Sequence, residues 1–177
     1  MAKETQKGIV LLVDDEEAIR ESLGELLTAC GYTIHTADCV DNAIKVVAKQ
    51  NDLEAIVSDW KMPVKAGIEL LRHLNKIGKE IPIIYLTGYG TLESCQEAVR
   101  EGAFDYILKP IDDKDKVLLP LKHAVDKSRM EKKNQELQAD ILRMAEEHMQ
   151  ILEELLVDVD TKDKVQKRIT EILDKWK

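Results

Sequence analysis

A short apolar run, Ala55-Ile56-Val57, leads into Asp59 and is followed by Met62-Pro63. A run of this length and composition is typical of a buried strand in a parallel sheet, and the proline prevents regular structure from continuing. We therefore expect Asp59 at the carboxyl end of a strand, at the edge where open α/β sheets bind ligands. Taken alone, Asp59 could also be an ordinary loop or helix-capping aspartate.

Predicted strands and helices alternate along the first two thirds of the chain. The strands are expected at residues 9–13, 32–36, 53–58, 81–86 and 104–108, and the helices between them at 17–28, 41–50, 67–77 and 91–101. Strands that are separated by helices form a parallel sheet through right-handed crossovers. The pattern therefore predicts an α/β fold with a doubly wound, five-stranded parallel sheet.

Polar side chains follow four of these strands. Asp14 and Asp15 follow the first, Asp59 the third, Thr87 the fourth and Lys109 the fifth. In a parallel sheet these ends share one edge, and clustered carboxylates either shift in pKa or hold a cation. Oxygen ligands suit Mg²⁺, a lysine and a hydroxyl complement phosphoryl oxygens, and aspartate can form an aspartyl-phosphate. The edge is therefore predicted to phosphorylate one of its own carboxylates.

Each of these residues also has a plainer interpretation. Asp14 or Asp15 could cap the first helix, and one residue could do both jobs. Lys109 could be a solvated surface lysine, and Thr87 could simply favour a strand end.

Four motifs resemble those of the receiver domain of two-component response regulators, the CheY-like fold. They are Val13-Asp14-Asp15-Glu16, Ser58-Asp59-Trp60-Lys61-Met62-Pro63, Leu86-Thr87-Gly88 and Leu108-Lys109-Pro110. The resemblance covers residues 8 to about 125. It implies phosphoryl transfer to this chain from a sensor histidine kinase or a phosphotransfer protein, with Mg²⁺ as cofactor.

The resemblance also implies a role for each matching residue of the acceptor and metal site. Asp59 matches the phosphoacceptor, and Asp15 matches the direct Mg²⁺ ligand. Asp14 matches the acidic partner that acts through water. Lys61 matches the position whose backbone carbonyl completes the metal site.

Three further residues match the parts that respond to the phosphoryl group. Thr87 matches the switch hydroxyl, and Lys109 matches the lysine that pairs with the phosphoryl group. Tyr106 matches the aromatic side chain that turns inward when the hydroxyl moves. Tyr106 could also be an ordinary half-buried strand aromatic.

Composition limits the kinds of partner and the cellular compartment that we expect for this chain. The net charge of −8 argues against a nucleic-acid-binding surface spread over the chain, and no direct nucleic-acid binding is expected. Cys30, Cys39 and Cys95 have no CxxC spacing and are typical of free thiols in a reducing cytoplasm. No signal peptide is recognised, and no apolar run approaches the ~20 residues of a membrane span. A cytoplasmic protein without membrane association is therefore expected.

Beyond residue 125 the chain is predicted to be a helical extension, 126–177. A fifth receiver helix is expected within 112–126, where Pro120 should either kink the helix or mark the start of its regular part. Residues 127–136 are expected to form a solvated helical spacer.

From Leu137 onward, mostly apolar residues recur at spacings of three and four and so form two adjacent stripes along the predicted helix. The first stripe is Leu137, Ile141, Met144, His148, Ile151 and Leu155, and the second stripe is Gln138, Leu142, Ala145, Met149, Leu152, Leu156 and Val159. A second amphipathic helix is marked by Val165, Ile169, Ile172, Leu173 and Trp176. A helical hairpin or coiled coil of this kind cannot bury its own apolar face, so homodimerisation or capture of another protein's helices is predicted.

The output of such a chain is left open by its sequence. The leading hypothesis is a response regulator that signals by protein–protein contact through its helical tail and is not an enzyme beyond its own phosphorylation and dephosphorylation. One alternative is the receiver and linker of an NtrC-type transcription regulator. Another is a phosphohydrolase with an aspartyl-phosphate intermediate.

Overall fold

The computed structural model describes residues 6–88, 100–155 and 159–174. Its sheet has five parallel strands in the order β2-β1-β3-β4-β5, which confirms the predicted fold class. The strands are β1 (Gly8–Val13), β2 (Tyr32–Ala37), β3 (Ala55–Asp59), β4 (Ile83–Thr87) and β5 (Asp105–Leu108). Their bounds differ from the predicted ones by one or two residues.

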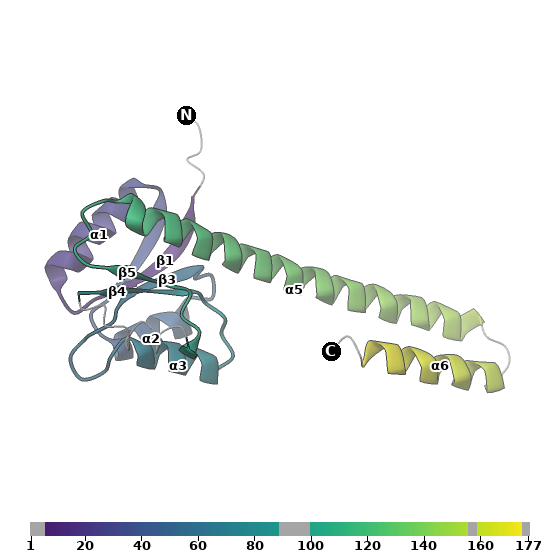
Figure 1. The fold of residues 1–177 in the computed structure, drawn as a ribbon. Helices are drawn as coiled ribbons and strands as arrows, with labels where there is room; N and C mark the ends of the chain where they lie inside the picture. The colour runs from purple at the N-terminus through teal and green to yellow at the C-terminus, as the bar shows by residue number, and fades with distance from the viewer. Residues whose placement is uncertain (1–5, 89–99, 156–158, 175–177) are drawn as a thin grey trace, which may run out of the picture. The chain divides into compact units, whose positions relative to one another are not determined.

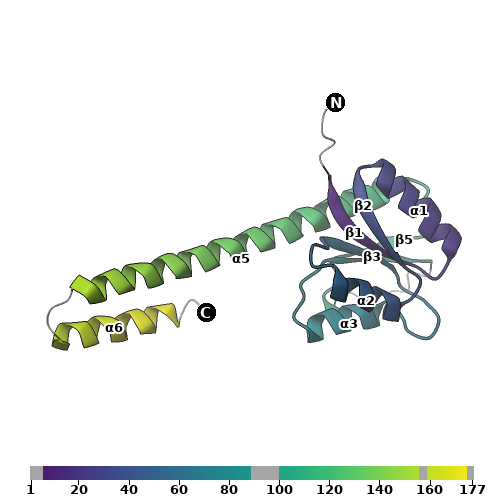
Figure 2. The same cartoon turned by 180° about the vertical axis from the view of Figure 1, so that it is seen from behind.

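Helices cover both faces of this sheet (Figures 1 and 2). Helices α2 (Val40–Lys49) and α3 (Ile68–Lys76) pack on one face, and α1 (Glu17–Ala29) and the start of α5 (Asp115–Leu155) pack on the other. Because side chains alternate along a strand, β1 sends Leu11 into the first layer and Val10 into the second. Most of the predicted helix 91–101 lies outside the described residues, as does Cys95.

The fifth receiver helix excludes one of the two predicted roles of Pro120 and differs from its prediction at Ser128. Helix α5 begins at Asp115, so Pro120 lies inside the helix and not at the start of its regular part. Ser128, which we expected in a solvated spacer, is only 3% exposed. It continues the helical face of Leu121, Ala124 and Val125, because residues four apart share one side of a helix. The packed part of α5 therefore extends beyond residue 127.

The chain divides into two compact units, Met1–Arg129 and Met130–Lys177. The boundary lies a few residues after the predicted one. At the end of the first unit, Arg129 forms an ion pair of 2.6 Å with Glu54, whose other oxygen accepts the backbone N–H of Ile9. These contacts fix the last turn of the first unit to the beginning of β1.

In the second unit, the end of α5 and helix α6 (Val159–Leu173) lie side by side and antiparallel (Figures 1 and 2). The predicted hairpin is therefore found. Among the described residues, no helix is long and apolar enough to span a bilayer.

Candidate functional site

Strand register brings the predicted site residues to one edge of the sheet. Val13 of β1 is paired with Ser58 of β3, Asp59 with Leu86 of β4, and Thr87 with Leu108 of β5. These four strands therefore end level with one another. Asp14 follows β1, the neighbour of β3. Lys109 follows β5, two strands away from β3, and its side chain reaches Asp59 at the end of β3.

Lys109 joins two carboxylates at this edge. Its Nζ lies 2.5 Å from Asp59 Oδ1 and 3.0 Å from Asp14 Oδ2. The Asp14 side chain is fully buried, and those of Asp59 and Lys109 are 10% and 19% exposed. Burial alone would lower the pKa of the Lys109 ammonium, but the hydrogen bonds to Asp59 and Asp14 outweigh it and raise the pKa above the usual lysine value.

Asp59 is also held from its own loop. Its Oδ2 accepts the backbone N–H of Lys61 at 2.7 Å. The loop returns to the strand end at Gly67, whose backbone N–H donates a hydrogen bond to the carbonyl oxygen of Trp60. A Cβ at Gly67 would lie 2.3 Å from Asp59 O, so only glycine allows this close approach. Asp59 is thus fixed with one carboxylate oxygen on Lys109 and the other on the backbone.

Asp14 serves both the helix and the site. Its Oδ1 accepts the backbone N–H of Glu16 at 2.9 Å, just before α1, while its Oδ2 binds Lys109. Arg20, one turn into α1, donates to Asp14 O at 2.7 Å. Asp14 thus holds the backbone just before α1 as well as Lys109. The N-cap of α1 is Glu16, without a side-chain cap hydrogen bond, so the plainer interpretation of Asp14 or Asp15 as a helix cap is wrong.

The remaining predicted residues are placed less closely. Thr87 is 7% exposed and its carbonyl accepts the N–H of Lys109 at 2.8 Å. Asp15 is exposed, and Tyr106 is 42% exposed, so its ring is not inserted into the core. The structure thus unites Asp14, Asp59 and Lys109, with Thr87 beside them, while Asp15 and Tyr106 face solvent.

The donor set suits a hard cation. Asp14 and Asp59 offer carboxylate oxygens, which Mg²⁺ prefers, and Lys109 already places one positive charge between them. Among residues 6–88, 100–155 and 159–174, no three acidic, histidine or cysteine side chains are grouped to hold a metal ion. The two buried carboxylates therefore form the core of the predicted site, and the metal role of Asp15 stays a prediction.

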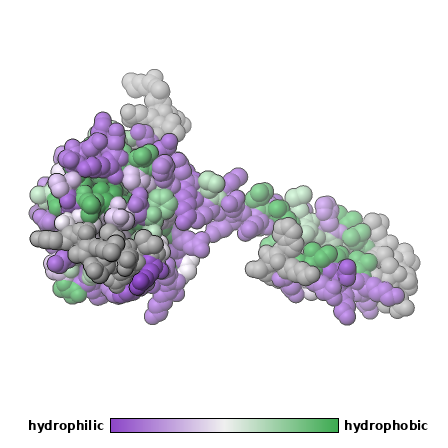
Figure 3. Space-filling model, in the orientation of Figure 1, coloured by the Kyte–Doolittle hydropathy of each residue, from purple (hydrophilic) through white to green (hydrophobic). Residues whose placement is uncertain are grey.

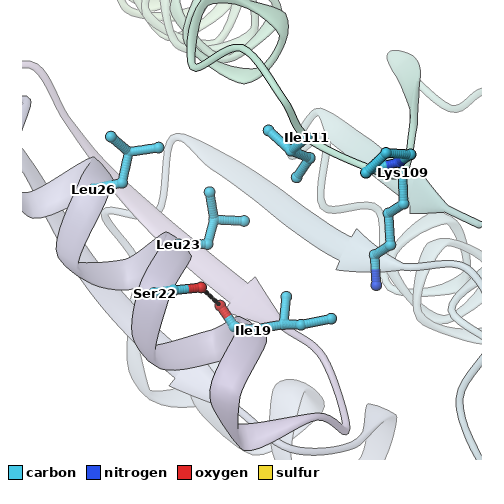
Figure 4. Close-up of a pocket in the computed structure, with 7 residues that line it drawn as sticks. Ile19, Ser22, Leu23, Leu26, Lys109 and Ile111 are labelled. Carbon is cyan, nitrogen blue, oxygen red and sulfur yellow. Dashed lines mark hydrogen bonds between the residues drawn. The ribbon is translucent and has the colours of Figure 1, made fainter.

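Sequence reasoning missed a pocket of about 470 Å³ next to the site (Figure 4). It is lined by Ile19, Ser22, Leu23, Leu26, Lys109, Pro110 and Ile111. In Figure 4, Lys109 lies on the opposite side of the pocket from Leu23 and Leu26, and its side chain extends past the strand ends. Ile19, Leu23 and Leu26 are apolar positions that predict a core-facing helix and gave no signal for this pocket, because it forms only where the segment after β5 lies beside α1.

Known proteins share this architecture. The FixJ transcriptional regulatory protein of Bradyrhizobium diazoefficiens is 28% identical over 162 residues, which cover 89% of this chain and 78% of that protein. The response regulator FleR of Pseudomonas aeruginosa is 33% identical over 116 residues, 66% of this chain. This chain spans about a quarter of the length of FleR (24%) and of NtrX-like regulators of Rickettsia (29%).

Solved structures agree with these relatives. The crystal structure of the FixJ N-terminal domain matches with a TM-score of 0.63 and 31% identity, over 69% of this chain and 96% of that one. NtrX from Brucella abortus, solved with ATP, matches with a TM-score of 0.67 and 25% identity, over 80% of this chain and 34% of that one.

The family described as response regulator receiver domain matches residues 10–119, which include Asp14, Asp59, Thr87 and Lys109. With its five-stranded sheet and its carboxylate–lysine site, this chain belongs to the receiver-domain family of two-component response regulators.

Proposed function

We propose that Asp59 accepts a phosphoryl group from a histidine kinase or a phosphotransfer protein. The observation that carries this proposal is the placement of Asp59, buried at a strand end with Lys109 Nζ 2.5 Å from one carboxylate oxygen. A carboxylate oxygen of Asp59 attacks phosphorus, a P–O bond forms, the P–N bond to the donor imidazole breaks, and that nitrogen keeps its electron pair. Asp59 therefore ends as a mixed anhydride.

Lys109 is proposed to bind the phosphoryl group after transfer. Before transfer its ammonium binds the carboxylates of Asp59 and Asp14. Once one Asp59 oxygen carries the phosphoryl group, that carboxyl loses its full negative charge, and the ammonium is free to bind a phosphoryl oxygen. The Thr87 hydroxyl is proposed to donate to a second oxygen, and Tyr106 is proposed to turn inward in response. The outward Tyr106 ring fits the unphosphorylated state.

Receiver domains generally bind Mg²⁺ at the phosphorylation site. Here Asp14, Asp15, Asp59 and the Lys61 carbonyl would hold it, and the ion would neutralise phosphoryl oxygens during transfer. The chain's own contribution is to fix the Asp59 carboxylate at the strand edge between Lys109 and the backbone N–H of Lys61. On this proposal the protein acts in the cytoplasm, where the kinase delivers its phosphoryl group, and turns over no other substrate.

The donor is proposed to approach over the pocket beside Lys109. Apolar side chains of Ile19, Leu23 and Leu26 line it, and it opens next to the residue that touches Asp59. A helical phosphotransfer partner would find apolar contacts there. The output is proposed to pass through protein–protein contact of the helical tail, because that unit carries exposed apolar side chains.

The test is phosphate uptake from acetyl phosphate with and without Mg²⁺, followed by mapping of the modified peptide. We expect one acid-stable, base-labile phosphoryl group on Asp59, formed only with Mg²⁺. Asp59→Asn should abolish it, and Asp52→Asn, at an exposed aspartate outside the site, is the matched control and should retain it. Uptake by Asp59→Asn at the wild-type rate would refute the proposal, and turnover of phosphate esters without a stable protein phosphate would favour the phosphohydrolase.

A further inference from the structure

The two stripes of the helical tail differ in burial. In the second stripe, Leu142, Ala145 and Met149 are half-buried, and Leu152, near the end of α5, is 44% exposed. In the first stripe, every apolar side chain whose burial is described is exposed, from Ile141 at 44% to Leu137 at 54%. On α6, Val165 and Ile169 are half-buried. The hairpin therefore uses the second stripe internally and leaves the first stripe uncovered.

Helix α6 adds to the uncovered side. Each residue of an α-helix is rotated by about 100° from the previous one, and α6 runs antiparallel to α5. This phase places Ile172, which is 50% exposed, on the same side of the hairpin as Ile141. Figure 3 shows hydrophobic side chains along both helices on one face of the hairpin. The exposed apolar side chains therefore form one continuous surface of the hairpin, which we term the open face. It consists of Leu137, Ile141, Met144, Ile151 and Ile172.

Charged residues border the open face asymmetrically. Residues 136–155 of α5 contain six acidic residues and one arginine, while α6 contains four basic and three acidic residues. The helical phase puts Asp140 and Glu147 along the outer edge of the open face on α5, and Lys164 and Arg168 along its outer edge on α6. These four side chains are exposed, and two of them also form an ion pair on their own helix, Asp140 with Arg143 at 3.3 Å and Arg168 with Glu171 at 4.0 Å. The face thus has one acidic border and one basic border.

We propose that the open face binds the open face of a second copy of this chain, giving a four-helix bundle in which α5 of each copy lies against α6 of the other. Two antiparallel hairpins related by a two-fold axis cover both faces in this way. The charge pattern selects the second copy and the pairing, because the acidic border of α5 meets the basic border of α6, while α5 against α5 would bring like charges together.

This inference names the partner of the tail that the proposed function assigns to output, but it requires neither Mg²⁺ nor phosphate. The first experiment is the mass of the full chain by light scattering between 1 and 200 µM, without a phosphodonor. We expect concentration-dependent doubling of the 20.1 kDa monomer mass, with the same dissociation constant in Asp59→Asn. Failure here leaves phosphate uptake on Asp59 untouched, so the two proposals fail separately.

Two single substitutions then locate the interface. Ile141→Glu places a charge in the open face and should raise the dissociation constant at least about 100-fold, because a charge would be buried without a partner. Ala139→Glu adds the same charge on the opposite side of α5, at an exposed position, and should leave the constant within about threefold. Equal effects of the two variants would overturn the open face as the interface.

A charge exchange tests which helices meet. The variants D140K/E147K and K164E/R168E should each self-associate at least about tenfold more weakly than the wild type. Mixed one to one, they should form a heterodimer of nearly wild-type affinity, because each α5 then meets an α6 of opposite charge. Wild-type self-association of either variant alone would overturn this pairing. A wild-type chain that stays monomeric at 200 µM would overturn the proposal and assign the open face to a different protein.

Discussion

In the receiver unit both faces of each central strand are covered, whereas in the tail only one of two apolar stripes is covered. Leu11 and Leu12, neighbours in β1, are each fully buried on opposite faces of the sheet. Ile141 and Leu142, neighbours in α5, are exposed and half-buried. The receiver therefore buries its core by itself, while the tail keeps apolar surface that another molecule can cover.

The largest effect should come from removing a core side chain of the receiver. Leu12→Ala deletes buried methyl groups of a fully buried residue and should lower the free energy of unfolding by about 3 kcal/mol. Leu137→Ala, at an exposed position of the tail, should leave the receiver transition within about 0.5 kcal/mol. Urea unfolding followed by the fluorescence of Trp60, which packs edge-on to Tyr85, reports this transition. Equal losses would remove the contrast between the units.

The second prediction concerns the cation at the site. Because Lys109 supplies the positive charge between Asp14 and Asp59, Lys109→Met should bind Mg²⁺ about tenfold more tightly, while losing phosphate uptake. Mg²⁺ titration of Trp60 fluorescence, in a Trp176→Phe background, measures the affinity. Lys122→Met, at an exposed lysine of α5, is the matched control and should bind as the wild type does. Weaker Mg²⁺ binding in Lys109→Met would contradict this electrostatic account.

The third prediction follows from the raised pKa of Lys109. A group whose pKa is higher in the folded state stabilises the fold fully below its unfolded pKa and loses this contribution as the pH rises through the folded pKa. The receiver should therefore lose stability as the pH rises above the ordinary lysine pKa of about 10.5. Urea unfolding at pH 8 and pH 11 should show a smaller alkaline loss in Lys109→Met than in Lys122→Met. The same loss in both variants would be inconsistent with the site geometry.

The smallest effect belongs to the tail. Among the described residues, Gln166 Oε1 is the buried side-chain polar atom without a hydrogen-bond partner. Gln166→Leu removes this unsatisfied oxygen and should stabilise the hairpin by up to about 1 kcal/mol. Thermal unfolding of the tail helices by circular dichroism measures this effect. No change, with the receiver transition also unchanged, would show that the oxygen is satisfied in solution.

The sequence predicted the receiver well because several independent patterns agreed. The apolar runs, the helical spacing and the polar residues at strand ends all indicated one sheet edge, and Asp14, Asp59 and Lys109 meet there. The Lys61 N–H bond to Asp59 and the close approach at Gly67 were not predicted, since they depend on the path of a loop.

The tail was less predictable for a physical reason. Periodicity identified both stripes but could not say which one the hairpin would cover, because either fits an antiparallel helix. Ser128 was assigned to solvent from its polarity, whereas its position on the buried face of α5 decides its burial. Helical phase relative to the core, rather than residue type, set that outcome.

The most direct test of the account is the rate of phosphate uptake in the wild type, Asp59→Asn and Ile141→Glu, with acetyl phosphate and Mg²⁺. If the receiver holds the chemistry and the tail holds the interface, Asp59→Asn takes up no phosphate, and Ile141→Glu, although monomeric, takes it up within about twofold of the wild-type rate. Phosphate on a residue other than Asp59, or loss of uptake in Ile141→Glu, would contradict this division.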